Sequence, residues 1–242
     1  MRKENTIFYV LNSSMYQSYI DKMDYSKYKA KFEFLKRLLP ENPVIVECGA
    51  HYGEDTIRFL HTFSGCHIHA FECDPRNLAI IRKHLSLEQR CSINPIALGK
   101  QNGTMPFYQA FKSEPLQKKY EWIGSEDFES LRLGNSGSSS LKKSSRPDLT
   151  NSKTIEVPVT TLDSYAYERV DLLWIDVQGA EKDLLEGASN TLSKTKHIWI
   201  EAGETTYQDA MTIKETKQLL NEHGFQFIKK DKNDLLFSKL ET

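Results

Sequence analysis

The stretch Val44-Ile-Val-Glu-Cys-Gly-Ala-His-Tyr-Gly53 decides the fold of this chain. Its first residues are apolar on both faces, as in a central strand of a parallel sheet, and its glycines predict a tight turn into a helix over Asp55 to Thr62. A second strand, from His67 to Glu72, then ends in a carboxylate. This order predicts an α/β unit that binds its ligand at the carboxyl ends of the strands.

The spacing of the turn and the position of Glu72 indicate the kind of ligand. The turn is Gly-x-x-x-Gly, unlike the Gly-x-Gly-x-x-Gly that wraps a pyrophosphate. Its glycines allow the backbone to approach a ligand closely, and Glu72 is placed to accept hydrogen bonds from two ribose hydroxyls. These features predict an adenosine-bearing ligand and favour S-adenosylmethionine (AdoMet) over a dinucleotide.

Length and charge limit the class of protein. The chain has 242 residues and a formal net charge of -1, which is enough for one α/β domain with a large core and few appendages. It has no apolar run of about 20 residues and no signal-peptide pattern at its start. We therefore expect a cytoplasmic protein without a membrane span. The near-neutral charge argues against a general nucleic-acid surface, although a local patch remains possible. It is compatible with a small molecule or a glycan as the binding partner.

The four cysteines predict buried, reduced thiols, because none of them forms a Cys-x-x-Cys pair. A group of Cys66, His67, His69 and Cys73 looks superficially like a metal site. Its spacing matches no zinc pattern, and Glu72 within it is assigned to ribose, so we expect no metal there.

The remaining pattern places a helical extension before the main domain. Apolar residues recur at helical spacing from Met15 to Leu39, so residues 1–43 are predicted to be an N-terminal helical extension. Residues 44–242 form the predicted AdoMet-binding domain, a mostly parallel sheet with one antiparallel strand near the C-terminus. Its further strands are predicted over Ser92 to Leu98, Gly103 to Tyr108, Ile155 to Thr160, Val170 to Val177, His197 to Glu201, Phe225 to Lys229 and Leu235 to Ser238.

A polar stretch at about 110–153 interrupts this rhythm of strands and helices. It could be a plain linker, but loops of this length in compact domains usually have a function, so we favour a mobile insertion over the mouth of the active site. Lys142, Lys143 and Arg146 could bind an anionic group of the substrate, although a solvated charged loop is the commoner explanation. The substrate candidates are Ser138, Ser139, Ser140, Lys142, Lys143 and Arg146.

Taken together, the motifs resemble those of the FkbM-type AdoMet-dependent methyltransferases. The resemblance runs from Val44 to about Phe227 and rests on the glycine turn and on Phe71-Glu-x-Asp-Pro75, Ala97-Leu-Gly99, Ser138-Ser-Ser-Leu141, Val157-Pro-Val-Thr-Thr-Leu-Asp163 and Asp171-Leu-Leu-Trp-Ile-Asp-Val-Gln-Gly-Ala-Glu181. It implies the class I methyltransferase (Rossmann-like) fold, a three-layer α/β sandwich with a seven-stranded sheet, and usually O-methylation of sugar or natural-product hydroxyls. Three positions depart from the common family pattern: His51, Trp174 and Gln178.

Because the carboxyl ends of parallel strands meet at one edge, four carboxylates should surround one crevice: Glu47, Glu72, Asp176 and Glu201. A hydroxyl acceptor needs a base or a metal to remove its proton. We expect Asp176 as the base, with Glu201 and His51 as further candidates; Asp176 could instead bind the amino group of AdoMet or a divalent cation. The cofactor-binding candidates are Glu47, Gly49, Ala50, His51, Gly53, Thr56, Glu72, Cys73, Ala97, Leu98, Asp176 and Gln178.

Two other functions stay open. A nicotinamide-dependent sugar-nucleotide enzyme would share Glu72 but should also have Gly-x-Gly-x-x-Gly, which is absent, and a Tyr-x-x-x-Lys pair, which we do not find. A non-catalytic binding module on the same fold would be expected to lose the ribose carboxylate or the glycine turn, and both are present. The sequence therefore favours an AdoMet-dependent methyltransferase, and the resemblance implies that it methylates a hydroxyl of a sugar or a glycan.

Overall fold

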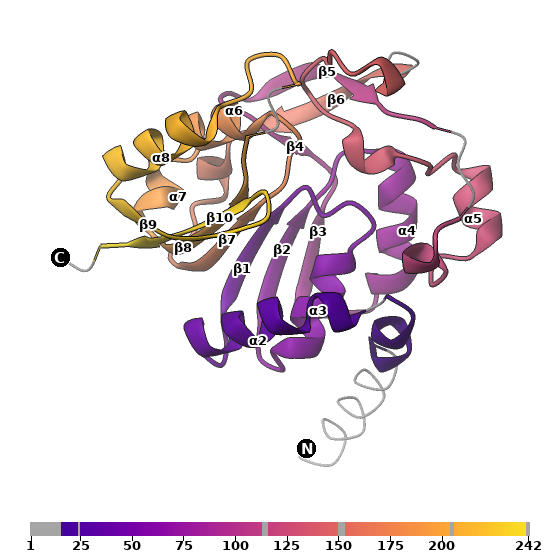
Figure 1. Cartoon of the computed structure of the whole chain (residues 1–242), viewed down its shortest axis with the longest axis horizontal. Helices are drawn as coiled ribbons and strands as arrows, with labels where there is room; N and C mark the ends of the chain where they lie inside the picture. The colour runs from indigo at the N-terminus through magenta and orange to yellow at the C-terminus, as the bar shows by residue number, and fades with distance from the viewer. Residues whose placement is uncertain (1–15, 24, 113–115, 150–152, 204–205, 241–242) are drawn as a thin grey trace.

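The computed structural model describes residues 16–23, 25–112, 116–149, 153–203 and 206–240 (Figure 1). Its main sheet has seven strands, and only β10 runs antiparallel to its neighbours. This confirms the predicted mostly parallel sheet with an antiparallel strand near the C-terminus. The order across the sheet is β3 (Cys91–Asn94), β2 (His67–Phe71), β1 (Val44–Cys48), β7 (Val170–Ile175), β8 (Thr195–Glu201), β10 (Asp234–Lys239) and β9 (Phe225–Asp231).

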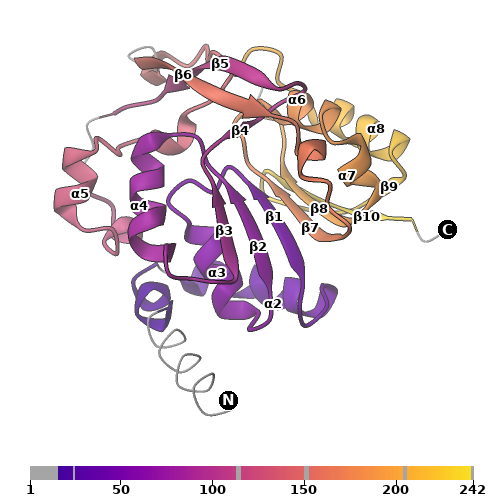
Figure 2. The ribbon, with the colours of Figure 1, turned by 180° about the vertical axis from the view of Figure 1, so that it is seen from behind.

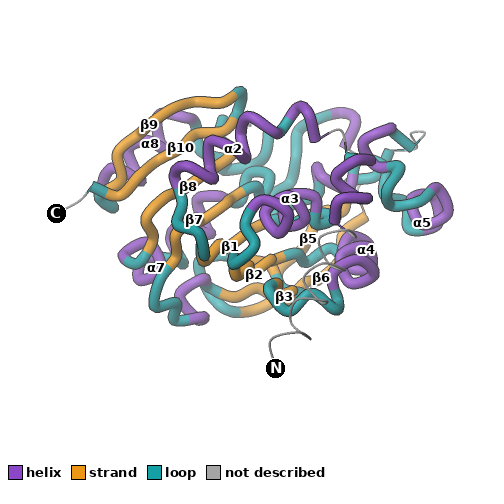
Figure 3. The backbone as a smooth tube through the Cα atoms, turned by 90° about the horizontal axis from the view of Figure 1, so that it is seen from below, coloured by secondary structure: helices purple, strands orange, loops and turns teal. Residues whose placement is uncertain are grey.

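Helices cover both faces of the main sheet, which gives three layers (Figure 3). Successive side chains of a strand point to opposite faces. Accordingly, Ile45 packs with α2 (Lys29–Leu38), α3 (Glu54–Thr62) and α4 (Pro75–Leu85), whereas Val46 packs with the opposite layer. That layer contains α6 (Glu181–Glu186), α7 (Ser189–Ser193) and α8 (Ile213–Glu222). No helix among the described residues is long and apolar enough to cross a membrane.

The single strand predicted over Ser92 to Leu98 is wrong. Strand β3 ends at Asn94, and Ala97–Leu98 form β4 of a second sheet with the order β4-β6-β5. Pro95 lies at the break, and proline has no N–H for a ladder and restricts the residue before it. The other strands of this small sheet are β5 (Gly103–Gln109) and β6 (Lys153–Thr160). The small sheet lies across the carboxyl ends of β1–β3 (Figures 1 and 2).

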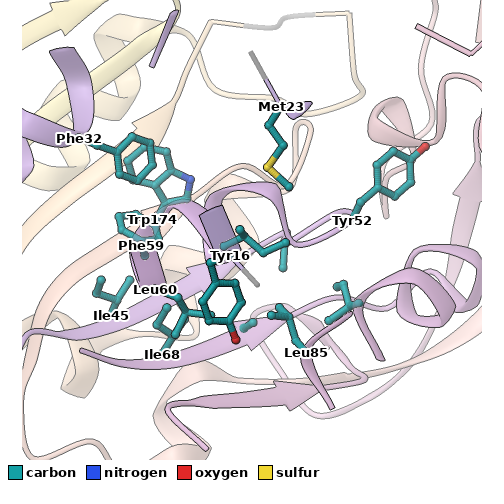
Figure 4. Close-up of a cluster of buried hydrophobic side chains, with 14 of the residues drawn as sticks. Tyr16, Met23, Phe32, Ile45, Tyr52, Phe59, Leu60, Ile68, Leu85 and Trp174 are labelled. Carbon is teal, nitrogen blue, oxygen red and sulfur yellow. The ribbon is translucent and has the colours of Figure 1, made fainter. Parts of the chain in front are cut away.

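The N-terminal region packs on the α3 face of the main sheet. Residues 16–22 are helical, and Tyr16 and Met23 are buried in the same core cluster as Phe32 of α2 and Trp174 of β7 (Figure 4). The first 15 residues of the predicted extension, residues 1–43, lie outside the described part of the chain. The described part adds a layer of aromatic side chains to the core of the main domain.

Much of the insertion predicted at about 110–153 also packs on the main domain. It contains α5 (Ser125–Ser130), and its residues Trp122, Ile123, Phe128 and Leu133 are buried in the large core cluster. Residues 113–115 and 150–152 of the predicted insertion lie outside the described part of the chain. A plain exposed linker would not bury four large apolar side chains.

Candidate active site

A cavity of about 260 Å³ lies at the carboxyl ends of the central strands. Its walls come from the turn after β1, the end of β2, the small sheet, the insertion and the loop after β7. The predicted candidates that line it are Gly49, His51, Glu72, Cys73, Ala97, Leu98, Ser139, Asp176 and Gln178. The fold thus brings together residues from five separate parts of the sequence.

Glu72 forms one wall of this cavity and is only 8% exposed. Its Oε2 atom accepts the N–H of His51 at 2.8 Å, and its Oε1 atom accepts the N–H of Asp74 at 2.7 Å. Burial raises the pKa of Glu72 to about 7, against the effect of these backbone donors. Each carboxylate oxygen retains a lone pair, so the side chain can still accept two ribose hydroxyls.

An apolar slot adjoins Glu72. It is formed by Ala97 and Leu98 of β4, Phe107 of β5, and Leu141 of the insertion. Asn77 of α4 also lines the cavity, and its Oδ1 atom has no hydrogen-bond partner among the described residues. A flat apolar slot with a polar amide beside a ribose carboxylate fits an adenosine group. Sequence reasoning missed Phe107, Leu141 and Asn77, because no local motif links them to the glycine turn.

Gly49 allows the turn after β1 to lie against the backbone at the end of β7. It has a φ of 87°, and a Cβ atom there would lie 1.8 Å from the backbone oxygen of Asp176. The N–H groups of Gly49 and Ala50 both donate to the oxygen of Phe71, at 3.0 and 2.9 Å. The glycine thus permits the turn after β1 to pack against the end of β7.

Asp176, Gln178 and Glu201 form a hydrogen-bonded group at the end of β7 and β8. The Nε2 atom of Gln178 donates to Asp176 Oδ1 and to Glu201 Oε2, both at 2.6 Å. Enclosure by protein, followed by the nearby charge of Glu201, raises the pKa of Asp176 well above its usual range. Asp176 is exposed to the cavity, whereas Glu201 is half-buried and reaches it through Gln178. Gln178 has a φ of 52°, an uncommon conformation for a residue with a side chain.

His51 joins the glycine turn to the insertion. Its Nδ1 atom lies 3.0 Å from Glu54 Oε1, and its Nε2 atom lies 2.9 Å from the hydroxyl of Ser136. Burial opposes charging of the ring, but the Glu54 carboxylate outweighs it and raises the pKa of His51. Both ring nitrogens therefore have partners within the protein, and the role of His51 as a base stays a prediction.

A second cavity of about 240 Å³ continues from the first. Gly49, His51, Tyr120 and Asp176 line both cavities. The second one extends toward the N-terminal helix, and its further walls include Tyr28, Lys31, Glu47, Ala50, Arg58, Trp174 and Trp199. Gly53 and Thr56 are not among the residues that line either cavity; the Thr56 hydroxyl donates instead to the buried carboxyl of Glu47.

The predicted substrate residues are not gathered in one place. Ser139 lines the first cavity, whereas Ser138, Lys142 and Lys143 line a separate cavity of about 300 Å³. Ser140 is buried, and its hydroxyl donates to the backbone oxygen of Gln178 at 2.6 Å. Lys142 forms an ion pair with Asp183 at 2.8 Å. Arg146 lines none of these three cavities.

No group of three or more His, Cys, Asp or Glu side chains suited to a metal ion occurs within the described ranges. Of the four residues that superficially resemble a metal site in the sequence, Cys73 lines the first cavity. The His67 and His69 rings pack on one another with centroids 4.9 Å apart. A role of Asp176 as a metal ligand stays a prediction.

Comparison with known proteins agrees with this geometry. The sequence profile of the Methyltransferase FkbM domain matches residues 47–227. The chain is 27% identical over 208 residues to the 2-O-methyltransferase NoeI of Sinorhizobium fredii (strain NBRC 101917 / NGR234), which covers 81% of this chain and 78% of that protein.

The structure is also similar to that of the methyltransferase FkbM from Methylobacillus flagellatus KT, with a TM-score of 0.50 and 15% identity. The match covers 95% of this chain but 59% of that chain, so this protein spans about three fifths of its length. The likeness shows a shared class I methyltransferase fold. Since the family profile covers most of its length, the chain belongs to the FkbM methyltransferase family.

Proposed function

We propose that this protein is an AdoMet-dependent O-methyltransferase that acts on a hydroxyl of a sugar or a glycan. One observation carries the proposal: a single cavity is lined by a ribose-type carboxylate, an apolar slot and the exposed carboxyl of Asp176. Membership of the methyltransferase family supports methyl transfer. The name of the relative NoeI supports an oxygen acceptor.

The residues of the first cavity fit the adenosine part of AdoMet. Glu72 would accept the ribose hydroxyls, and the slot of Ala97, Leu98 and Phe107 would hold the adenine. When bound, AdoMet supplies an electrophilic methyl group on a sulfonium. Its positive charge would be favoured near Asp176, which lines both cavities.

The protein's part in the reaction is to position the acceptor and take its proton. A sugar hydroxyl is a weak nucleophile until its proton is removed, and a base with a pKa raised toward neutrality suits this task. Asp176 would be that base; burial and then the nearby charge of Glu201 raise its pKa, while the hydrogen bond from Gln178 orients its carboxylate. The contact of His51 with Ser136 would hold the insertion against the site and restrict water.

Isothermal titration calorimetry with S-adenosylhomocysteine tests the proposal, with NAD titrated in parallel. We expect micromolar binding of S-adenosylhomocysteine, weakened about 10-fold or more in Glu72→Gln because ribose hydrogen bonds are lost. Circular dichroism would verify the fold of the variant. Binding of NAD alone would replace this proposal with a nicotinamide enzyme, and binding of neither ligand would favour a non-catalytic module.

The acceptor can then be sought with methyl-labelled AdoMet and a panel of saccharides. A methyl ether survives mild base, whereas a methyl ester is hydrolysed, so treatment with base separates hydroxyl from carboxyl acceptors. Labelled product that survives base supports O-methylation of a hydroxyl. Label that is lost in base would indicate a carboxyl acceptor. That result, or no labelling of any saccharide, would contradict the proposed acceptor. The cytoplasmic location stays a prediction.

A further inference from the structure

The turn after β1 has no backbone donor left for an anionic ligand. Besides the N–H groups of Gly49 and Ala50, that of His51 donates to Glu72, that of Tyr52 to Glu54 at 3.0 Å, and that of Gly53 to the Ala50 oxygen at 2.8 Å. A carboxylate that enters this site must therefore find side-chain donors.

Cationic side chains line only one of the two joined cavities, as far as the described residues go. The first cavity has no lysine or arginine in its wall, and both nitrogens of its histidine have partners. Beside five carboxylates (Glu47, Glu54, Asp55, Asp176 and Asp234), the second has Lys31 of α2 and Arg58 of α3. Both are largely withdrawn from solvent, with side chains 16% and 8% exposed.

Lys31 and Arg58 are held in place and still have donors to spare. Lys31 Nζ lies 2.7 Å from Asp234 Oδ2 and 4.8 Å from the ring centre of Trp199. Arg58 Nη1 lies 2.6 Å from Asp55 Oδ1, and the guanidinium carbon lies 3.9 Å from the ring centre of Tyr28. An ammonium has three N–H donors and a guanidinium five, so each can bind a further acceptor.

We propose that Lys31, together with Arg58 of the same cavity, binds the α-carboxylate of the methionyl group of AdoMet, while the acidic side chains of that cavity face its α-amino group and sulfonium. The N-terminal helix α2 is then part of the cofactor site. The inference rests on the proposed function and extends it to Lys31, which lies outside the family profile that begins at residue 47. The buried Trp174 and Trp199 form an apolar part of the wall of this second cavity, and a charge-assisted hydrogen bond is stronger where protein replaces water.

A pair of ligands that differ only in the carboxylate tests this inference by calorimetry. The ligands are S-adenosylhomocysteine and its decarboxylated analogue, S-adenosyl-3-thiopropylamine. We expect Lys31→Met to weaken binding of S-adenosylhomocysteine about 10-fold or more and to leave the analogue within about 2-fold of wild type. Lys31→Arg, which keeps the charge, should recover part of the lost affinity.

Lys29→Met is the matched control, because Lys29 lies on the same helix, is 66% exposed and lines neither cavity. It should bind both ligands as wild type does. Equal weakening of both ligands by Lys31→Met would show that Lys31 acts only through the fold, and unchanged binding of both would show that the carboxylate lies elsewhere; either result overturns the inference while leaving the proposed function intact. If the wild-type protein binds neither adenosyl ligand, the proposed function fails, and this inference with it.

Discussion

The backbone oxygen of Asp176 packs directly against Gly49, where a Cβ atom would lie only 1.8 Å away. This contact joins the turn after β1 to the end of β7, the two segments that line both cavities. The requirement for glycine at position 49 therefore comes from the packing of two parts of the protein. The same position also has a φ of 87°, which residues with a side chain rarely adopt.

Gly49→Ala should destabilise the protein by about 3 kcal/mol or more, because a clash with backbone is added to the strain of a left-handed φ. Gly224→Ala is the matched control: its φ is 80°, but the atom nearest to the added Cβ is the Cε of Lys239 at an ordinary 3.8 Å. That variant should lose only about 1 kcal/mol. Urea denaturation measures both, and equal losses would contradict the role of the Asp176 contact.

Glu201→Gln should shift the pH dependence of methyl transfer. The charge of Glu201 contributes to the raised pKa of Asp176, so its removal should lower that pKa. Since a base must be deprotonated to act, the acidic limb of kcat/KM should move to lower pH, by about one unit. A pH–rate profile measures this shift. A profile with an unmoved acidic limb would exclude Asp176 as the group that titrates in it.

Glu72 should make the ligand-free protein less stable as the pH rises. Its pKa is raised from 4.5 to about 7 in the folded state, so the folded protein holds a proton that the unfolded chain has released. The resulting stability is present below about pH 4.5 and is lost as the pH passes about 7, by on the order of 1–3 kcal/mol.

Glu72→Gln should remove this contribution. The difference in free energy of unfolding between about pH 5 and about pH 8 should become smaller than in wild type, as measured by urea titration at both values. Burial also raises the pKa of Glu181 to about 7. Part of the pH dependence should therefore remain in Glu72→Gln. A difference that is identical in wild type and Glu72→Gln would mean that Glu72 is ionised in the folded protein at both pH values.

Phe107→Ala should weaken the binding of S-adenosylhomocysteine by about 1–3 kcal/mol, because it removes apolar surface from the slot that we assign to adenine. Phe111→Ala is the control, since Phe111 contacts Arg132 and lines neither joined cavity. Calorimetry on both variants measures the difference. If both bind as wild type does, adenine does not lie in this slot.

Some features of the site could be predicted from the sequence because they are local. The apolar run before Glu47, the glycines after it and the cap of the following helix act over a few residues. Asp74, for example, directly precedes Pro75 at the start of α4, and its side chain accepts the N–H of Arg76 at 3.0 Å. The same reasoning placed Glu72 at a strand end, where the structure has it. The break at Pro95 was also visible in the sequence and should have ended the third strand.

The sequence by itself determined the succession of strands and helices along an α/β domain and the residues at most strand ends, since hydrophobic periodicity and turn residues act locally. Only the tertiary structure decided which groups are free to bind a ligand. Local motifs did not show that every N–H of the glycine turn is already bonded within the protein, that His51 has two partners, or that Lys31 of α2 faces the same cavity as Trp199 of β8. Hydrogen bonds between segments far apart in the chain depend on how the layers pack, and packing satisfies or exposes each polar group.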